Sequence, residues 1–289
     1  MQLSETHIAI LLENPIRFQE YAVGIFKSIP TKSGIKKAIK KGHVHIDGKL
    51  ATTAQFIQGG ECIELFESDQ GTQFKRLELP LEVLFEDDYL AVIYKPAGIV
   101  VSGNKFVTIA NALTQNLQKS KQQDAVKPQP IHRLDYPTSG VLLIGKTAAS
   151  IIALSQLFET KEVQKTYHAI CVGKMSAQGM INKEIDDKTS LTKYQVLQSV
   201  ASPRFEFLNL VQLSPKTGRK HQLRIHLSSI GNQILGDKEY GNEDLILKGN
   251  GLYLHASTLE FIHPFTKDPI CITKELPKKF EKIFPNYIP

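Results

Sequence analysis

The sequence predicts an α+β protein with two domains, a small one over residues 1–68 and a large one over residues 80–289. A chain of 289 residues is longer than one ordinary domain. In the larger part, short runs rich in β-branched residues outnumber the helical patterns and do not alternate with them one to one. The polar, aperiodic stretch 66–79 indicates a linker. We therefore expect a mixed, largely antiparallel sheet in the larger domain.

Composition and charge place the chain among ordinary globular proteins. Hydrophobic residues make up 42% and charged residues 22%, which excludes collagen-like, coiled-coil and wholly disordered proteins. No apolar run approaches the roughly 18–20 residues that span a bilayer, and the N-terminus lacks the pattern of a signal peptide. Three widely spaced cysteines argue against a disulfide framework and a metal knuckle. We expect a cytoplasmic protein with no membrane association, no metal or cofactor and no obligate protein partner.

Positive charge is concentrated in one short segment. Residues 31–50 contain six lysines and one aspartate, so they carry +5 of the formal net charge of +6. Ser33 is expected to cap a helix in this segment and Gly42 to end it. The lysines expected along its surface are Lys36, Lys37, Lys40 and Lys41. A phosphate backbone would neutralise them, although a solvated basic face explains the same run.

The elements that follow the basic helix are short strands. A strand pattern over His43–Ile46 is followed by the hairpin turn residues Asp47 and Gly48, and Ile57 and Gly59–Leu65 indicate further strand. This order resembles the S4 RNA-binding domain, on the positions Gly42, Val44, Ile46, Asp47, Gly48, Lys49, Gly60, Glu61 and Ile63. The resemblance implies that residues 1–68 form a small α+β domain that binds RNA.

In the larger part, strands are expected where short apolar runs are bounded by turn residues. These runs are Val83–Phe85, Leu90–Ile93, Gly140–Ile144, Tyr167–Val172, Phe207–Gln212 and Tyr253–His255. Helices are expected where apolar residues recur every three or four positions. These segments are Thr108–Leu117, Ala148–Thr160 and His221–Ile230. The polar stretch Gln118–Gln129 is expected to form a surface loop.

Two motif-like patterns are expected to carry no function. Residues Gly140–Thr147 match the phosphate-loop pattern, but their variable positions are Val-Leu-Leu-Ile, which favours a strand whose N–H groups pair within a sheet. His221 and His226 are five residues apart, so on a helix their rings would point roughly 140° from each other. That spacing does not suit a metal pair, and we expect hydrogen-bonding or core histidines.

Three polar clusters are the candidates for chemistry. In the first, Asp135 follows Arg133 and precedes a turn that leads into an expected strand. The second is Lys165–Ala169, which contains Tyr167, and the third is the cationic segment Thr217–His226 at the start of a helix. The residues alone leave two interpretations open, an exposed carboxylate at a cleft and an aspartate that merely forms a turn.

These clusters together resemble the RluA family of RNA pseudouridine synthases. The family motifs stand at His132–Gly140, Lys165–Tyr167, Thr217–His226, Ile230–Gly241 and Leu254–Pro264, and the resemblance covers about residues 80–289. One departure follows Gly98, where Val101 is succeeded by Ser102 and Gly103 instead of the usual His-Pro, and we expect it to affect only the rim of the cleft. The resemblance implies the pseudouridine synthase fold for the larger domain.

The resemblance also implies roles for individual residues. Asp135 matches the catalytic aspartate, Arg224 the arginine that pairs with it, and Tyr167 the tyrosine that packs against the target base. Arg133 matches the arginine that fills the gap left by the extruded base. The further residues expected to contact substrate or RNA are His132, Thr138, Arg219 and His221, together with Lys36, Lys37, Lys40 and Lys41.

The implied activity is isomerisation of uridine to pseudouridine in RNA without a metal or cofactor. Whether Asp135 attacks C1′ of the ribose or removes a ribose proton stays open. The expected partner is RNA, with ribosomal RNA of the large subunit favoured over transfer RNA. The alternative is a non-catalytic RNA-binding or ribosome-assembly factor on the same scaffold, which has no chemical need for Asp135, Tyr167 and Arg224 together.

Overall fold

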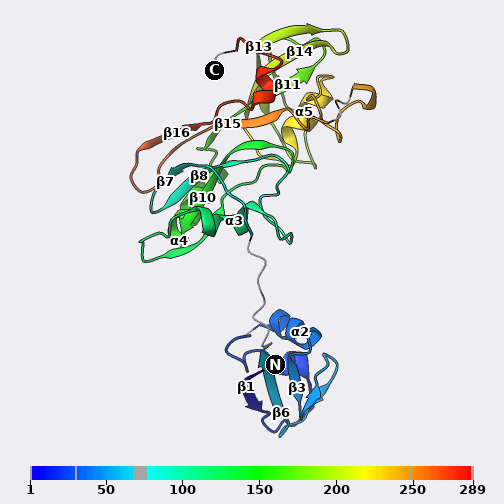
Figure 1. The fold of residues 1–289 in the computed structure, drawn as a ribbon, viewed down its shortest axis with the longest axis vertical. Helices are drawn as coiled ribbons and strands as arrows, with labels where there is room; N and C mark the ends of the chain where they lie inside the picture. Colours follow the sequence, from blue (N-terminus) through cyan, green and yellow to red (C-terminus); the bar gives the residue numbers. More distant parts are fainter. Residues whose placement is uncertain (1, 30, 68–76, 246, 248, 288–289) are drawn as a thin grey trace. The chain divides into compact units, whose positions relative to one another are not determined.

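A computed structural model divides the protein into two units, one within residues 1–76 and one within residues 77–289 (Figure 1). Each unit has a hydrophobic core of its own. The central part of the predicted linker, residues 68–76, lies outside the described residues. The residues that the structure describes are 2–29, 31–67, 77–245, 247 and 249–287.

The smaller unit is a sheet with two helices packed into its core. Its elements are β1 (Gln2–Ile8), β2 (Ile16–Arg17), α1 (Phe18–Tyr21), α2 (Lys32–Lys40), β3 (Val44–Ile46), β4 (Lys49–Leu50), β5 (Phe56–Ile57) and β6 (Cys62–Glu67). Four strands pair in the order β1-β6-β3-β4. Ile35 and Ala38 of α2 are buried against Val44 and Ile63 of the sheet, because the helix is apolar on one side only.

The structure agrees with most of the turns, helices and strands predicted for the smaller unit, with two corrections. The hairpin between β3 and β4 turns at Asp47 and Gly48, both with positive φ, as that residue pair favours. The cap of α2 is Thr31 and not Ser33, because the chain is still extended at Thr31 and its hydroxyl accepts the amide of Gly34 at 3.2 Å. The strand β1 was not predicted, since its sequence has no regular alternation of apolar residues.

The larger unit contains a ten-stranded mixed sheet, which confirms the predicted α+β class. The main path of the sheet runs β12-β13-β14-β11-β15-β10-β8-β7, with β16 beside β15 and β9 beside β10. Its strands are β7 (Val83–Glu86), β8 (Leu90–Lys95), β9 (Ala125–Pro130), β10 (Ser139–Thr147), β11 (Gln164–Val172), β12 (Gln178–Ile181), β13 (Thr192–Ser202), β14 (Glu206–Pro215), β15 (Leu254–Ile262) and β16 (Pro269–Thr273).

One short parallel contact joins the two halves of this sheet. Strands β10 and β15 pair in parallel only at Ser139 with His255 and at Gly140 with Ala256, whereas the other pairings are antiparallel. Gly140 is required here, because its φ is +133° and a Cβ would lie 2.1 Å from the carbonyl oxygen of Ala256. Separate hydrophobic cores lie under the two halves. The loop before β10 therefore lies at the seam of the sheet.

Three helices of the larger unit lie close to their predicted positions; they are α3 (Ile109–Asn116), α4 (Ala148–Glu159) and α5 (Gln222–Ser229). The 3-10 helix η1 (Glu243–Leu245) and the helix α6 (Lys278–Glu281) were not predicted. The predicted loop Gln118–Gln129 is partly wrong, since Ala125–Pro130 forms β9 on the edge of β10. Its prolines are tolerated because an edge strand has N–H groups that need no partner in the sheet.

Candidate active site

Asp135 lies in the loop before β10, and a buried lysine holds the backbone of that loop. The amide of Thr138 donates to the carbonyl of Asp135 at 3.0 Å, which closes a turn. The ammonium group of Lys95, at the end of β8, donates to the carbonyls of Thr138 at 2.7 Å and Tyr136 at 3.4 Å. Burial lowers the pKa of Lys95 to about 8, while the charge of Asp135 acts against this shift. The carboxylate, 15% exposed, is therefore presented from a fixed loop.

The segment before α5 is held by one glutamine side chain. The Oε1 atom of Gln222 accepts from the hydroxyl of Thr217 at 2.7 Å and from the amide of Arg219 at 3.0 Å. Its Nε2 atom donates to the carbonyl of Leu191 at 3.1 Å. These bonds fix the path of the chain into the helix, so that the side chains on the first turn of α5 have defined positions.

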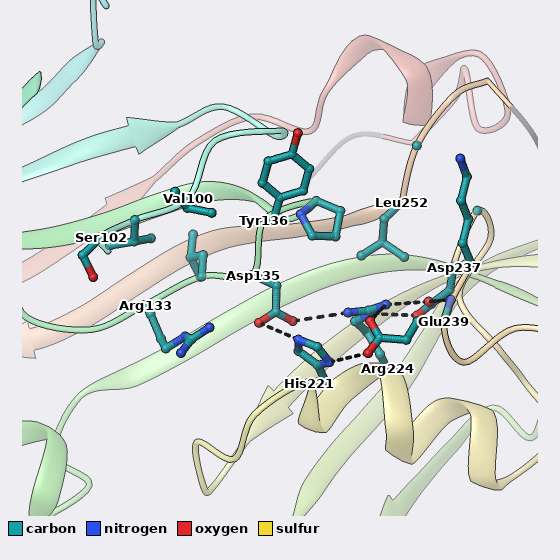
Figure 2. Close-up of a pocket in the computed structure, with 16 residues that line it drawn as sticks. Val100, Ser102, Arg133, Asp135, Tyr136, His221, Arg224, Asp237, Glu239 and Leu252 are labelled. Carbon is teal, nitrogen blue, oxygen red and sulfur yellow. Dashed lines mark hydrogen bonds and ion pairs between the residues drawn. The ribbon is translucent and has the colours of Figure 1, made fainter. Parts of the chain in front are cut away.

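His221 connects Asp135 to two residues of the loop after α5. It precedes the helix in a left-handed conformation, with a φ of 55°. Its Nε2 atom lies 3.7 Å from Oδ1 of Asp135 (Figure 2). Its Nδ1 atom shares a 2.9 Å hydrogen bond with the hydroxyl of Tyr240. The same Nδ1 atom lies 3.4 Å from Oε1 of Glu239. The imidazole therefore belongs to one polar network with the carboxylate.

Arg224 is the buried cation of this network, and its principal partner differs from the predicted one. Its guanidinium donates to both carboxylate oxygens of Asp237, at 2.8 and 2.7 Å, and to Glu239 at 3.0 Å. The distance from its Nη1 atom to Oδ2 of Asp135 is 3.9 Å, at the outer limit of an ion pair (Figure 2). Burial acts to lower the pKa of Arg224, but Asp237 and Glu239 outweigh it and raise that pKa. Asp237 thus holds the guanidinium in place beside Asp135.

Tyr167 is placed beside the same carboxylate by an irregularity in β11. The pairing of β11 with β15 shifts register between Thr166 and Tyr167, and such a bulge redirects the side chain that follows it. Burial and the charge of Asp135 raise the pKa of the Tyr167 phenol far above its usual value. The phenol therefore keeps its proton at neutral pH. An ionised carboxylate, a guanidinium and a neutral phenol at one cleft can support nucleophilic or acid–base chemistry.

Two pockets meet at Asp135. The first, here named the Tyr167 pocket because Tyr167 lines it, has a volume of about 350 Å³. The second, here named the Tyr136 pocket because Tyr136 lines it, has a volume of about 630 Å³. The residues that line both are Arg133, Leu134, Asp135, His221 and Arg224. A third hollow of about 870 Å³, here named the lysine groove, shares Lys165 and Arg219 with the Tyr167 pocket.

The two pockets and the lysine groove differ in the balance of charged side chains that line them. The Tyr167 pocket is lined by five cationic side chains against the single carboxylate of Asp135; the cations are Arg133, Lys165, Arg219, Lys220 and Arg224. In the lysine groove four cations face one carboxylate; the residues are Lys161, Lys165, Lys216, Arg219 and Glu159. The Tyr136 pocket is balanced, with three cations and three carboxylates; these are Arg133, Arg224, Lys238, Asp135, Asp237 and Glu239.

The remaining predicted contact residues fall into three settings. Arg133 is exposed and lines both pockets, and Arg219 lines the Tyr167 pocket and the lysine groove. His132 forms part of the pocket wall, because its Nε2 atom accepts the amide of Leu143 at 3.1 Å and burial lowers its pKa to about 3. The four predicted lysines are exposed on the smaller unit; they are Lys36, Lys37 and Lys40 of α2 and Lys41 at its C-terminal cap.

Thr138 is buried in the wall of the Tyr167 pocket, where it was predicted to contact substrate. Among the described residues, no hydrogen-bond partner is present for its hydroxyl oxygen. A buried hydroxyl without a partner is costly, so this atom is suited to a polar group of a bound ligand.

Four residues of the site were not singled out from the sequence. Lys95 follows the expected strand Leu90–Ile93, and Asp237, Glu239 and Tyr240 lie in the motif stretch Ile230–Gly241. Their neighbours gave no signal of burial, since Asp237 and Glu239 flank Lys238. Their partners could not be read, because they come from separate loops.

The two patterns set aside in the sequence have structural explanations. Gly140–Thr147 lies within the buried strand β10, as expected. His226 is buried and bonds to the hydroxyls of Ser190 and Thr192. In the part of the chain that the structure describes, no group of three or more potential ligands could hold a metal ion. No helix among the described residues is both long and apolar enough to span a membrane.

Comparison with known proteins identifies the family. The model of the RNA pseudouridylate synthase family matches residues 89–229. The ribosomal large subunit pseudouridine synthase D of Nitrosomonas europaea is 32% identical over 275 residues, covering 86% of this chain and 77% of that protein. The tRNA pseudouridine synthase C of Haemophilus influenzae is 34% identical over 235 residues, covering 72% and 98%.

Solved structures give the same result for the fold. The human RNA pseudouridylate synthase domain containing 4 superposes with a TM-score of 0.56 at 27% identity, over 69% of this chain and 90% of that chain. The family match lies within the unit that contains Asp135. The comparisons give no support to a non-catalytic RNA-binding factor. The chain therefore belongs to the RluA family of RNA pseudouridine synthases, enzymes that isomerise uridine to pseudouridine in RNA.

Proposed function

We propose that this pseudouridine synthase modifies ribosomal RNA of the large subunit, with Asp135 as the catalytic carboxylate. The observation that supports the choice of RNA is the similarity to a ribosomal large subunit synthase over 86% of the chain, a share that must extend from the larger unit into the smaller one. The relative named for transfer RNA is matched over 72%. A ribosomal substrate would place the enzyme in the cytoplasm.

The reaction breaks the C1′–N1 bond of uridine and forms a C1′–C5 bond in its place. Two routes are compatible with one carboxylate. In the first, Asp135 attacks C1′, the uracil leaves with the electron pair on N1, and C5 later displaces the carboxylate. In the second, Asp135 removes the ribose proton at C2′ as the uracil leaves with the electron pair on N1, which forms a C1′–C2′ double bond, and Asp135 returns that proton when C5 bonds to C1′. Both routes end with loss of the proton from C5 and gain of a proton at N1, so the overall change is an isomerisation.

The neighbours of Asp135 support either route. Arg224, fixed by Asp237, places a positive charge 3.9 Å from a carboxylate oxygen of Asp135. Tyr167 presents a protonated phenol from the pocket wall, where it can pack against the extruded uracil. The buried hydroxyl of Thr138 is available for a polar group of the uridine. The enzyme must first extrude that base from the RNA stack, which costs about a few kcal/mol.

The RNA backbone is proposed to follow the cationic surfaces. The excess of positive side chains in the Tyr167 pocket and the lysine groove suits the phosphates next to the extruded uridine. We further propose that residues 1–68 are an S4-like RNA-binding domain. The support is the exposed lysine stripe of α2, which carries no acidic residue in its first turn.

Tritium release from RNA labelled at C5 of uridine tests this function, because the C5 proton is lost only when pseudouridine forms. The purified protein is mixed with large-subunit ribosomal RNA and, separately, with bulk transfer RNA. We expect release from ribosomal RNA, and none from the same RNA with Asp135→Asn. Release from transfer RNA alone would contradict the proposed substrate. Equal release by the native protein and Asp135→Asn would contradict the role of the carboxylate.

A further inference from the structure

The Tyr136 pocket remains unassigned once the target uridine is placed. Under the proposed function, the uracil packs against Tyr167, and this residue lines only the smaller of the two pockets at Asp135. The Tyr136 pocket is larger and shares with it Arg133, Asp135 and Arg224. When an RNA strand places its uridine in the Tyr167 pocket, the adjoining Tyr136 pocket therefore remains available beside the same carboxylate.

The charge of the Tyr136 pocket suits an uncharged group. Its cations and carboxylates are equal in number, and the strongest pair among them, Arg224 with Asp237, is already bonded at both carboxylate oxygens. Apolar side chains make up much of the remaining wall; they are Val100, Val101, Leu134, Pro137 and Leu252. A phosphate would find no excess of positive charge here, whereas the flat, neutral face of a nucleobase would be accommodated.

Tyr136 supplies the aromatic surface of this pocket. Its side chain is 55% exposed, which is unusual for a large ring next to a buried strand. Its carbonyl accepts from the amide of Gly98 at 2.8 Å and from the ammonium group of Lys95 at 3.4 Å. The ring is therefore exposed while its backbone is fixed. Figure 2 shows it between Val100 and Leu252 at the edge of the pocket.

A cation lies over the same ring. The ammonium group of Lys105 is 5.8 Å from the centroid of the Tyr136 ring, in a cation–π contact. This contact leaves the Tyr136 side chain 55% exposed, so that the ring still presents surface on which a base could stack. An aromatic ring with a neighbouring cation is the combination that binds bases of single-stranded nucleic acid, with the cation close to the phosphate that joins them.

We propose that the Tyr136 pocket is a second nucleobase site, which holds the nucleotide next to the target uridine in the same RNA, stacked on Tyr136. The proposal rests on the proposed function, because it requires the uridine to occupy the Tyr167 pocket. The site would make the enzyme sensitive to the identity and flexibility of a flanking base, and it would hold the RNA at the moment when the uridine is extruded.

Steady-state kinetics with substituted RNAs tests the site. The substrate is a ribosomal RNA fragment that the native enzyme modifies, prepared unmodified and with one abasic residue on the 5′ or the 3′ side of the uridine. The variants are Tyr136→Leu, which removes the ring but keeps an apolar group, and Tyr136→Phe, which keeps the ring. Phe265→Leu, on the hairpin between β15 and β16, serves as a control at an exposed aromatic outside both pockets.

We expect Tyr136→Leu to raise KM by about 5- to 100-fold, the range that loss of base stacking gives, with little change in kcat. Tyr136→Phe and Phe265→Leu should both behave like the native enzyme. On one of the two abasic RNAs, the native enzyme should show the same raised KM, and Tyr136→Leu should add no further increase. The effects of the substitution and of the abasic residue would then not add, as expected when both remove the same contact. A variant that only misfolds would instead be impaired on every RNA.

Two results would overturn the second site while leaving the proposed function intact. They are a native KM for Tyr136→Leu, and an increase in KM that is equally large on the unmodified and both abasic RNAs. If the native enzyme forms no pseudouridine in any ribosomal or transfer RNA, the proposed function itself fails and the second site fails with it.

Discussion

The two units of this protein use charge in opposite ways. The smaller unit exposes a stripe of lysines on the solvent side of α2 and at its C-terminal cap, Lys41. The larger unit buries charged groups in its interior, among them Lys95, Lys146, Arg224 and Asp237. An exposed charge interacts weakly with its neighbours and attracts a polyanion from a distance, whereas a buried charge must be paired and then holds its surroundings rigidly. Under the proposed function, exposed charges would attract the RNA, whereas the buried charges would position the reacting carboxylate.

The largest effect expected from this contrast concerns the buried pair of Arg224 and Asp237. Asp237→Asn removes one charge and leaves the guanidinium, 5% exposed, without its bidentate partner. We expect the free energy of unfolding of the larger unit to fall by about 3–5 kcal/mol, and pseudouridine formation to fall as Arg224 moves away from Asp135. Urea unfolding of the full chain, together with the tritium assay, measures both.

The matched control for that variant is Glu239→Gln. This carboxylate bonds the same guanidinium, but its side chain is 53% exposed. Because water screens it, the loss should stay below about 1 kcal/mol. If the two variants unfold at the same urea concentration, the buried pair has no special role and the contrast between the units is lost.

The next effect, which is smaller for each residue, concerns buried neutral histidines in the larger unit. Burial lowers the pKa of His132 to about 3, and of His168 and His255 to about 4. The unfolded chain takes up protons near pH 6.5, but the folded unit does so only near pH 3–4. The free energy of unfolding should therefore fall as the pH decreases from about 6.5 to 4.5, by up to about 1.4 kcal/mol per pH unit for each histidine.

Urea unfolding of the full chain at pH 7.5, 6.0 and 5.0 measures this dependence. His168→Asn keeps a polar side chain at the position but cannot take up a proton, so its stability should vary less with pH than that of the native chain. An identical slope for both proteins would show that His168 does not titrate as a buried neutral group.

The smallest effect on stability, and the clearest on binding, is expected at α2. Replacement of four exposed lysines by glutamine should weaken RNA affinity on the order of tenfold and flatten its dependence on salt, while the fold and kcat are retained. The substituted residues are Lys36, Lys37, Lys40 and Lys41. Filter binding to ribosomal RNA between 50 and 200 mM salt measures the slope. An unchanged salt dependence of RNA affinity would show that these lysines do not contact the RNA.

The sequence predicted those parts of the fold that local patterns determine. Helix α4 begins at the Thr147 cap, and β10 was recognised as a strand despite its phosphate-loop pattern. The errors arose where stability comes from pairing with distant segments. The polar residues of β9 form a strand only because the edge of β10 is beside them, and β1 depends likewise on β6.

The site was predictable in part for a related reason. Asp135, Tyr167 and Arg224 were identified by motifs, and the fold places them around one pocket. The bidentate partner of Arg224 was not identified, because Asp237 lies thirteen residues away across a loop whose path no local pattern specifies. The exposure of Tyr136 depends in the same way on a buried lysine from another strand, Lys95.

The central claim is that one carboxylate of the larger unit, Asp135, isomerises a uridine in ribosomal RNA of the large subunit. The most direct test maps pseudouridines in cells that lack the protein, and in the same cells supplied with the native chain or with Asp135→Asn. We expect at least one position in large-subunit RNA to lose its pseudouridine, to regain it with the native chain, and to remain uridine with Asp135→Asn. Restoration by Asp135→Asn, or an unchanged map of ribosomal RNA in cells without the protein, would contradict the claim.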